Sequence, residues 1–295
     1  MKSYFKITII LLLAVFITIF VSPLIAGLVS FPLHRIMSRV ILIVLFVAFF
    51  HYKDWLGFNS IKELGLNFDK KWFLMLVIGF LLALFSICII LVIMLQRNIR
   101  FVISDLHTIN WFKYLAGYLL AGLLVGLAEE CLFRGFLLQS LLKDTNMVIS
   151  VSATSIFYSF VHFLKPSSEI NPGRLSLITS INTVNSFFYN ISEKFSDIWP
   201  SMIGLFLVGV VLSVVCIRMG TLAVSIGMHA GWIIGIKSIS LATDVTSKGS
   251  LWVNGVVLGN PFTWMVLTAI IFLFIIPRKN KDTRRNGFKK VVNKI

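Results

Sequence analysis

Apolar runs long enough to cross a membrane alternate with short polar connections along most of the chain. A helix that spans a bilayer needs about 20 mostly apolar residues. Eight segments approach or exceed that length, the second and fifth being short: 7–29, 36–50, 72–95, 114–142, 148–164, 199–217, 221–241 and 261–277. The pattern predicts an all-α, polytopic membrane protein with about eight transmembrane helices.

The first apolar run follows two lysines, as the core of a signal peptide would. It is longer than the roughly 7–15 residues of such a core, and no clear Ala-x-Ala cleavage pattern follows it. We therefore expect a retained helix, and a single transmembrane domain over 1–277. The one long polar interruption, 165–198, contains an apolar fragment at Leu175–Ile191. We expect this fragment to form a helix on the membrane surface or a cap over a cavity.

The composition supports the membrane class. Hydrophobic residues make up 58% of the chain and charged residues only 13%, whereas soluble domains are about 25% charged. Much of the net charge of +15 lies in a basic tail, 278–295, which we interpret as a topology anchor that attracts anionic lipids rather than nucleic acid. Lys and Arg are more numerous on the side of both termini, which predicts cytoplasmic termini, in the plasma membrane.

Two adjacent acids and an arginine interrupt the apolar segment 114–142, at Glu129, Glu130 and Arg134. Each ionisable group at the centre of a bilayer costs roughly 2.5–3.5 kcal/mol, so such groups usually serve a function. Glu130 and Arg134 are four residues apart and should form an ion pair on one helix face. Glu129 points about 100° away and is left available as a general base. A purely structural ion pair between spans would explain Glu130 and Arg134 but not Glu129.

Two of the five histidines, His162 and His229, fall within predicted spans. Counting residues from the span ends places Glu129 and His162 at the same depth, about 20 Å into the membrane. His229 lies roughly one to two turns shallower by the same count. We therefore expect Glu129, His162 and His229 to meet in one polar catalytic cavity within the helix bundle.

Two chemistries fit a glutamate and two imidazoles. Glu129, His162 and His229 could bind Zn²⁺ and leave a coordination position for water. Alternatively, no cofactor is needed: Glu129 and His162 deprotonate a water, and His229 stabilises the oxyanion. The sequence contains neither H-E-x-x-H nor H-x-x-E-H, so we favour the metal-free chemistry.

Three motifs in this order resemble the CPBP family, the CAAX-protease and bacteriocin-processing group, which includes the eukaryotic CAAX prenyl endopeptidase. They are Glu129-Glu130-x-x-x-Arg134, Tyr158-x-x-x-His162 and a third helix with His229, within about 110–241. The resemblance implies an intramembrane endopeptidase with a glutamate-type mechanism, which cleaves a hydrophobic or lipidated peptide or protein. It also implies Glu129 as the base, His162 as the residue that positions water, Glu130 and Arg134 as supporting residues, and His229 at the oxyanion.

The chain departs from the family pattern at two positions. Tyr158 stands where Phe is usual, and its side chain is a candidate substrate contact. Ile233 stands where the family often has Asn, a candidate oxyanion donor whose loss costs on the order of 3 kcal/mol, or some hundredfold in rate. Trp232 is a candidate replacement donor, as are two asparagines of the polar loop, Asn182 and Asn185.

Two other classes of function remain open from the sequence. A catalytically silent immunity or scaffold protein of the same family would use the polar cluster only to hold its helices together. A proton-coupled transporter would use Glu129 as a protonation site. Transporters often contain inverted repeats, and none is visible in this chain.

Overall fold

A computed structural model describes most of the chain, and almost all of the described part is helical. The described ranges are 2–29, 31–106, 109–164, 176–246 and 256–276. The predicted basic tail, 278–295, lies outside them.

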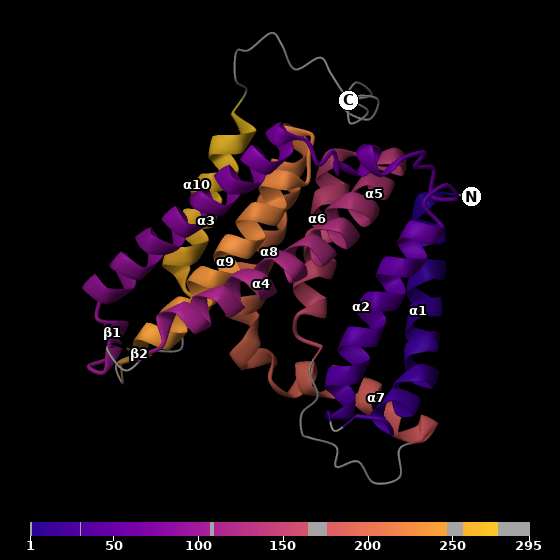
Figure 1. The fold of residues 1–295 in the computed structure, drawn as a ribbon, viewed down its shortest axis with the longest axis horizontal. Coiled ribbons are helices and arrows are strands. Elements are labelled where there is room, and N and C mark those ends of the chain that lie inside the picture. The colour runs from indigo at the N-terminus through magenta and orange to yellow at the C-terminus, as the bar shows by residue number, and fades with distance from the viewer. Residues whose placement is uncertain (1, 30, 107–108, 165–175, 247–255, 277–295) are drawn as a thin grey trace.

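Each apolar segment predicted from the sequence forms a helix (Figure 1). The helices are α1 Ser3–Ala26, α2 Leu33–His51, α3 Lys70–Gln96, α4 Trp111–Glu130, α5 Gln139–Asp144, α6 Met147–Val161, α7 Leu177–Glu193, α8 Phe195–Met219, α9 Ala223–Ala242 and α10 Pro261–Ile275. A π-helix, η3 Cys131–Leu138, joins α4 to α5, and a 3₁₀ turn, η1 Ile61–Leu64, precedes α3.

Six of these helical stretches in the described part of the chain are long and apolar enough to cross a membrane. They are α1, α2, α3, the continuous stretch Trp111–Asp144, α8 and α9. The chain is thus an all-α, multi-pass integral membrane protein. Two of the eight predicted spans, 148–164 and 261–277, correspond to α6 and α10, which have only 15 residues each. Asn146 and Asn260 cap the N-termini of these helices, so each begins where its side chain replaces the missing backbone acceptors.

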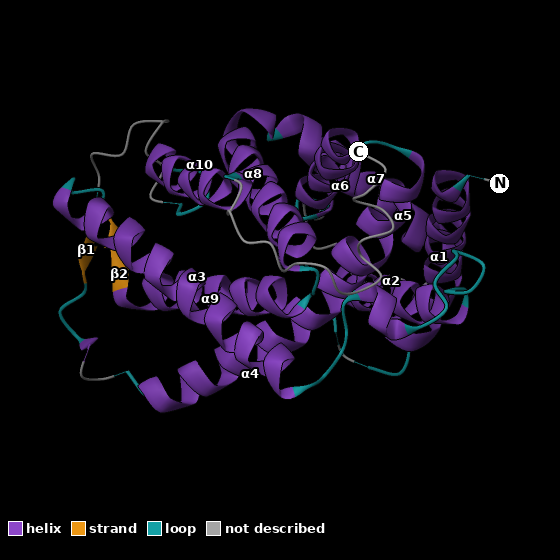
Figure 2. Ribbon diagram, turned by 90° about the horizontal axis from the view of Figure 1, so that it is seen from above, coloured by secondary structure: helices purple, strands orange, loops and turns teal. Residues whose placement is uncertain are grey.

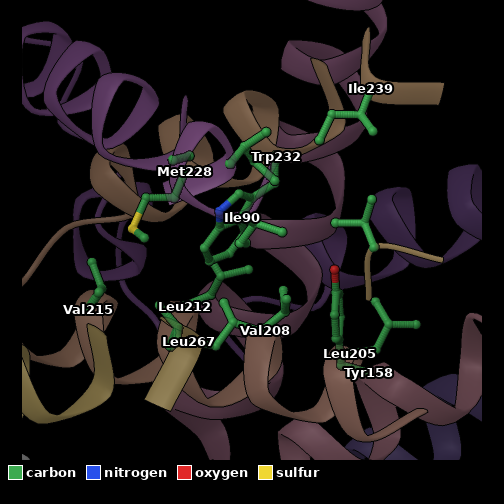
Figure 3. Packing of buried hydrophobic residues seen from close by; sticks show 14 of the residues in the cluster. Ile90, Tyr158, Leu205, Val208, Leu212, Val215, Met228, Trp232, Ile239 and Leu267 are labelled. Carbon is green, nitrogen blue, oxygen red and sulfur yellow. The ribbon is translucent and has the colours of Figure 1, made fainter. Parts of the chain in front are cut away.

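The helices α3 and α9 lie side by side, with α8 and α10 next to them (Figure 2). Glycine allows the α3 and α9 backbones to approach closely, since a Cβ built on Gly227 would lie 2.0 Å from the carbonyl oxygen of Leu76. A cluster of buried apolar residues from α3, α8 and α9 fills the space between them, including Ile90, Leu212 and Trp232 (Figure 3).

The helices α1 and α2 form a hairpin that packs on η3 and α5. Phe136 of η3 is fully buried, and its ring lies 5.1 Å from the ring centroids of Phe49 and Phe50 and 5.8 Å from that of Phe58. These aromatic contacts fix one face of the π-helix against the N-terminal hairpin. The opposite side of the same segment is free to carry polar groups into the bundle.

The structure also contains elements that the apolar pattern did not predict. The strands β1 Arg100–Val102 and β2 Thr243–Val245 pair antiparallel and join the ends of α3 and α9. They were missed because three residues at a helix end have too little alternation to read as a strand. The fragment Leu175–Ile191 was expected as a surface helix or a cap; it corresponds to α7, which packs against α1, α2 and α8.

Candidate active site

Glu130 lies at the centre of a buried ion network. Its Oε1 atom accepts a hydrogen bond from Arg134 Nη1 at 2.8 Å and lies 2.8 Å from Nδ1 of His229 on α9. The side chains of Glu130 and Arg134 are fully buried. A charge in such surroundings is stable only when it is paired and hydrogen-bonded, so one carboxylate holds both the guanidinium and the imidazole in place.

Arg134 connects this network to two further helices. Its Nη2 atom donates to the carbonyl oxygen of Gly209 on α8, at 3.2 Å. Its guanidinium carbon lies 4.5 Å from the centre of the Tyr158 ring on α6, a cation–π distance. The arginine therefore joins α4, α6 and α8 at the level of Glu130.

Glu129 lies on a different side of the helix and faces two imidazoles. Its Oε2 atom is 3.5 Å from Nε2 of His162 and 3.8 Å from Nε2 of His229. The side chain of Glu129 is 19% exposed and that of His162 is 28% exposed, whereas His229 is only 7% exposed. The cluster is thus accessible from the side of Glu129 and His162 and closed behind His229.

Hydrogen bonds at the two Nδ1 atoms orient both imidazoles. His162 Nδ1 lies 2.7 Å from the carbonyl oxygen of Tyr158, which can only accept, so Nδ1 carries a proton. His229 Nδ1 likewise faces the carboxylate of Glu130. In the neutral ring the lone pair is then on Nε2, and both Nε2 atoms point toward Glu129.

The π-helix shapes the site locally. Glu130 is the last residue of α4, and Arg134 lies within η3, whose i→i+5 bonding widens the helix. Such π segments occur often at functional sites, because they alter the direction of the side chains around them. In this chain the wider segment holds Arg134 toward α6 and α8 while Phe136 packs against α2.

Comparison with known families gives one match in the same region. A family model described as Type II CAAX prenyl endopeptidase Rce1-like matches residues 110–234, which include every residue of the ion network. The match covers less than half of the chain and supports the resemblance of this region to the CAAX endopeptidase (CPBP) family. Neither the curated proteins nor the solved structures contain a match to it. The match supports a CAAX-type intramembrane protease fold, and the matched family is a protease family.

The structure brings together the residues that the CAAX endopeptidase resemblance singled out. Glu130 pairs with Arg134 as the four-residue spacing predicts, and Glu129 meets His162 and His229. His162 differs in one respect, because it lies just beyond the C-terminal end of α6 rather than inside a longer span. The contact between His229 and Glu130 and the role of the Gly209 carbonyl were not foreseen, because both depend on how separate helices are rotated against one another.

Two candidate contacts require correction. Trp232 was a candidate oxyanion donor, but its indole N–H donates to Ser86 Oγ on α3 at 2.9 Å, so it is used within the core. Tyr158 was a candidate substrate contact, but it is 2% exposed and packs against Arg134, so it supports the arginine instead.

The candidate replacements for the family Asn are placed as follows. Ile233 is half-buried on α9, and its aliphatic side chain donates no hydrogen bond. Asn182 and Asn185 are exposed side chains of α7. Within the described residues, then, neither asparagine belongs to the buried cluster around Glu130.

Carboxylates and imidazoles such as those of Glu129, His162 and His229 are also common metal ligands. Across the described ranges, no group of three or more His, Cys, Asp or Glu side chains has an arrangement that could hold a metal ion. The metal-free mechanism and the Zn²⁺ alternative at Glu129, His162 and His229 both remain predictions. The nearby thiol of Cys131 is fully buried, and we assign it no chemical role.

Proposed function

We propose that this protein hydrolyses a peptide bond within the membrane, with Glu129 as the base that activates water. One observation carries the proposal: Glu129 Oε2 faces two imidazole Nε2 atoms, at 3.5 and 3.8 Å, while the neighbouring Glu130 bonds Arg134. The pairing of one acid leaves the other free to accept a proton. The position between Glu129 and His162, which is partly exposed, suits a reactive water.

The imidazoles of His162 and His229 would have different roles in the reaction. The 3.5 Å between Glu129 Oε2 and His162 Nε2 is longer than a direct hydrogen bond. A water that donates one proton to Glu129 and the other to His162 Nε2 would be held for attack. Glu129 takes the proton as the oxygen adds to the scissile carbonyl carbon, and passes it to the leaving nitrogen when the C–N bond breaks.

His229 would act on the opposite side of the reacting carbonyl. With Nδ1 bonded to Glu130, its Nε2 carries a hydrogen only when the ring is doubly protonated. The Glu130 carboxylate stabilises that imidazolium, which can then donate from Nε2 to the tetrahedral oxyanion. This arrangement gives Glu130 and Arg134 a supporting role.

The substrate we propose is a hydrophobic or lipidated peptide or protein that reaches the site from the bilayer. Long apolar helices of the kind that cross a membrane carry the site, which supports a substrate in or at the bilayer, with membrane lipids around the protein. The excess of Lys and Arg on one side supports a plasma-membrane protein with both termini in the cytoplasm.

The test compares the purified native protein with Glu129→Gln on a library of lipidated and hydrophobic peptides. We expect the native protein to cleave and the variant to lose roughly 10²–10⁴-fold in rate. Glu63→Gln, at a glutamate of the η1 turn, is the matched control and should cleave normally. A strong chelator in the same assay should leave the native rate unchanged, whereas loss of activity that Zn²⁺ restores would show a metal-dependent enzyme.

A specific observation favours a second candidate, a catalytically silent member of the family. Ile233 replaces the family Asn, and the Trp232 N–H that might replace its donor is bonded to Ser86. Equal absence of cleavage by the native protein and by Glu129→Gln, with both folded, would favour an immunity or scaffold role.

A further inference from the structure

Buried polar atoms without a protein partner are concentrated next to the site. Among the described residues, five such side-chain atoms belong to α4, η3, α5 and α6: Glu130 Oε2, Arg134 Nε, Ser140 Oγ, Thr154 Oγ1 and Ser155 Oγ. Buried polar groups in folded proteins nearly always have a hydrogen-bond partner. A cluster of exceptions in one place therefore points to a ligand that supplies the missing bonds.

Most of these residues lie on two segments that pack against each other, η3–α5 and α6. Arg134 lies against Tyr158 at one end of this interface, and Thr145 Oγ1 lies 2.7 Å from Ser150 Oγ at the other. The two contacts fix an antiparallel register between the η3–α5 segment and α6. In that register the pair 139–140 lies at the same level as the pair 154–155, and we call this stretch of the interface between α5 and α6 the seam.

Gly209 of α8 closes the seam at the end near the site. Its carbonyl oxygen accepts from Arg134 Nη2, and a Cβ built on Gly209 would lie 3.1 Å from Ser155 Oγ. Arg134 and Ser155 therefore meet at the same point of α8. From there, Glu130 bonds both Arg134 and His229, and His229 Nε2 lies 3.8 Å from Glu129 Oε2.

The other end of the seam opens toward the membrane surface. Ser150 is fully buried, its partner Thr145 is half-buried, and Lys143 and Asp144 beside them are exposed. Polar side chains thus occur at intervals along the interface, from an exposed charged turn to the buried carboxylate of Glu130.

Hydrogen bonds to carbonyls of their own helix do not account for these hydroxyl groups. Serine and threonine in membrane helices commonly bond a carbonyl of their own helix, as Thr18 does with Ala14 at 2.7 Å and Ser213 does with Gly209 at 2.8 Å. The hydroxyls of Ser140, Thr154 and Ser155 make no such bond. Water is the ligand that fits, because it both donates and accepts and satisfies hydroxyl, guanidinium and carboxylate groups alike.

We propose that the seam between α5 and α6 binds a file of water molecules that leads from the Lys143–Thr145 turn to Glu130 and supplies hydrolytic water to Glu129. The supply step rests on the proposed function; the binding of water does not. A protease in a bilayer consumes one water in each turnover, and the seam provides a polar route to a site surrounded by lipid.

Radiolytic footprinting of the full-length protein in detergent tests water binding directly. Hydroxyl radicals form at bound water and oxidise sulfur side chains next to it, even buried ones. Cys216 is fully buried and its thiol contacts Gln139, so we expect it to be oxidised. Met94 and Met228 are equally buried in the apolar cluster and serve as controls. Oxidation of Cys216 no faster than that of the two methionines would overturn the proposal.

Substitutions in the seam test the supply step. Thr154→Val and Ser155→Ala remove a hydroxyl with little change in shape, and each should lower kcat about five- to tenfold, as one lost hydrogen bond would, with KM unchanged. Thr18→Val is the matched control on α1, and its kcat should equal that of the native protein. An unchanged kcat in both seam variants would refute the supply of water along this route.

The two tests separate the two proposals. If the native protein cleaves nothing but Cys216 is oxidised, the proposed protease function fails and the water file stands. If the protein cleaves peptides and Cys216 resists oxidation, the protease stands and the water file fails.

Discussion

The interface of α3 with α9 and the interface of η3–α5 with α6 are built in opposite ways. The first is apolar and so close that Gly227 meets the Leu76 carbonyl, with one hydrogen bond, from Trp232 to Ser86, inside it. The second contains a buried ion pair and several hydroxyls without a protein partner. Both lie next to His229, which α9 carries from the first interface into the polar site.

The interface of α3 with α9 provides rigidity, whereas the interface of η3–α5 with α6 carries the candidate chemistry. In lipid there is little hydrophobic driving force between helices, so close contact of small residues is what holds α3 against α9. That rigid pair fixes the position of His229. The α6 side contains the polar groups that the proposed hydrolysis would use as base and water site. The predictions below separate these two contributions.

The largest effect on stability is expected for Glu130→Gln. The substitution removes the charge that pairs with Arg134, and leaving a buried guanidinium uncompensated costs about 3–5 kcal/mol. Thermal unfolding in detergent should show a clear fall in Tm. Glu129→Gln is the matched control, because Glu129 has no pairing with Arg134 to lose; its Tm should stay near the native value while cleavage is lost. Equal Tm values for the two variants would contradict the division of roles between the two acids.

A smaller loss of stability is expected for Gly227→Ala. The new methyl group would overlap the Leu76 carbonyl and push α3 from α9, and overpacking of this kind costs typically about 1–3 kcal/mol. The control is Gly117→Ala on α4, where a Cβ meets nothing within 4 Å. Unfolding by denaturant should show destabilisation in the first variant alone. A native midpoint for Gly227→Ala would mean that close contact does not hold this interface.

The smallest effect is expected for Trp232→Phe. The substitution keeps an aromatic ring in the apolar cluster but loses the bond to Ser86, worth about 1 kcal/mol. A double-mutant cycle with Ser86→Ala measures the pair, and we expect the two losses to be less than additive. Full additivity would show that the two side chains do not interact.

Local spacing predicted the helices and the first ion pair correctly. An apolar run identifies a membrane helix without knowledge of its neighbours. The pair of Glu130 and Arg134 follows from residues four apart on one helix. Equal depth in the membrane also sufficed to bring Glu129 and His162 together, because the rise per residue converts a count into a depth.

Contacts between separate helices could not be predicted in this way. Whether His229 bonds Glu129 or Glu130, and whether Trp232 faces the site or the core, depends on the rotation of α9 about its axis. That rotation is set by the glycine contacts with α3, which no single helix contains. The sequence alone thus determined which residues are polar, how deep they lie and which neighbours they pair with along one helix. Only the tertiary structure decided their partners across helices, because packing sets the direction in which each side chain points.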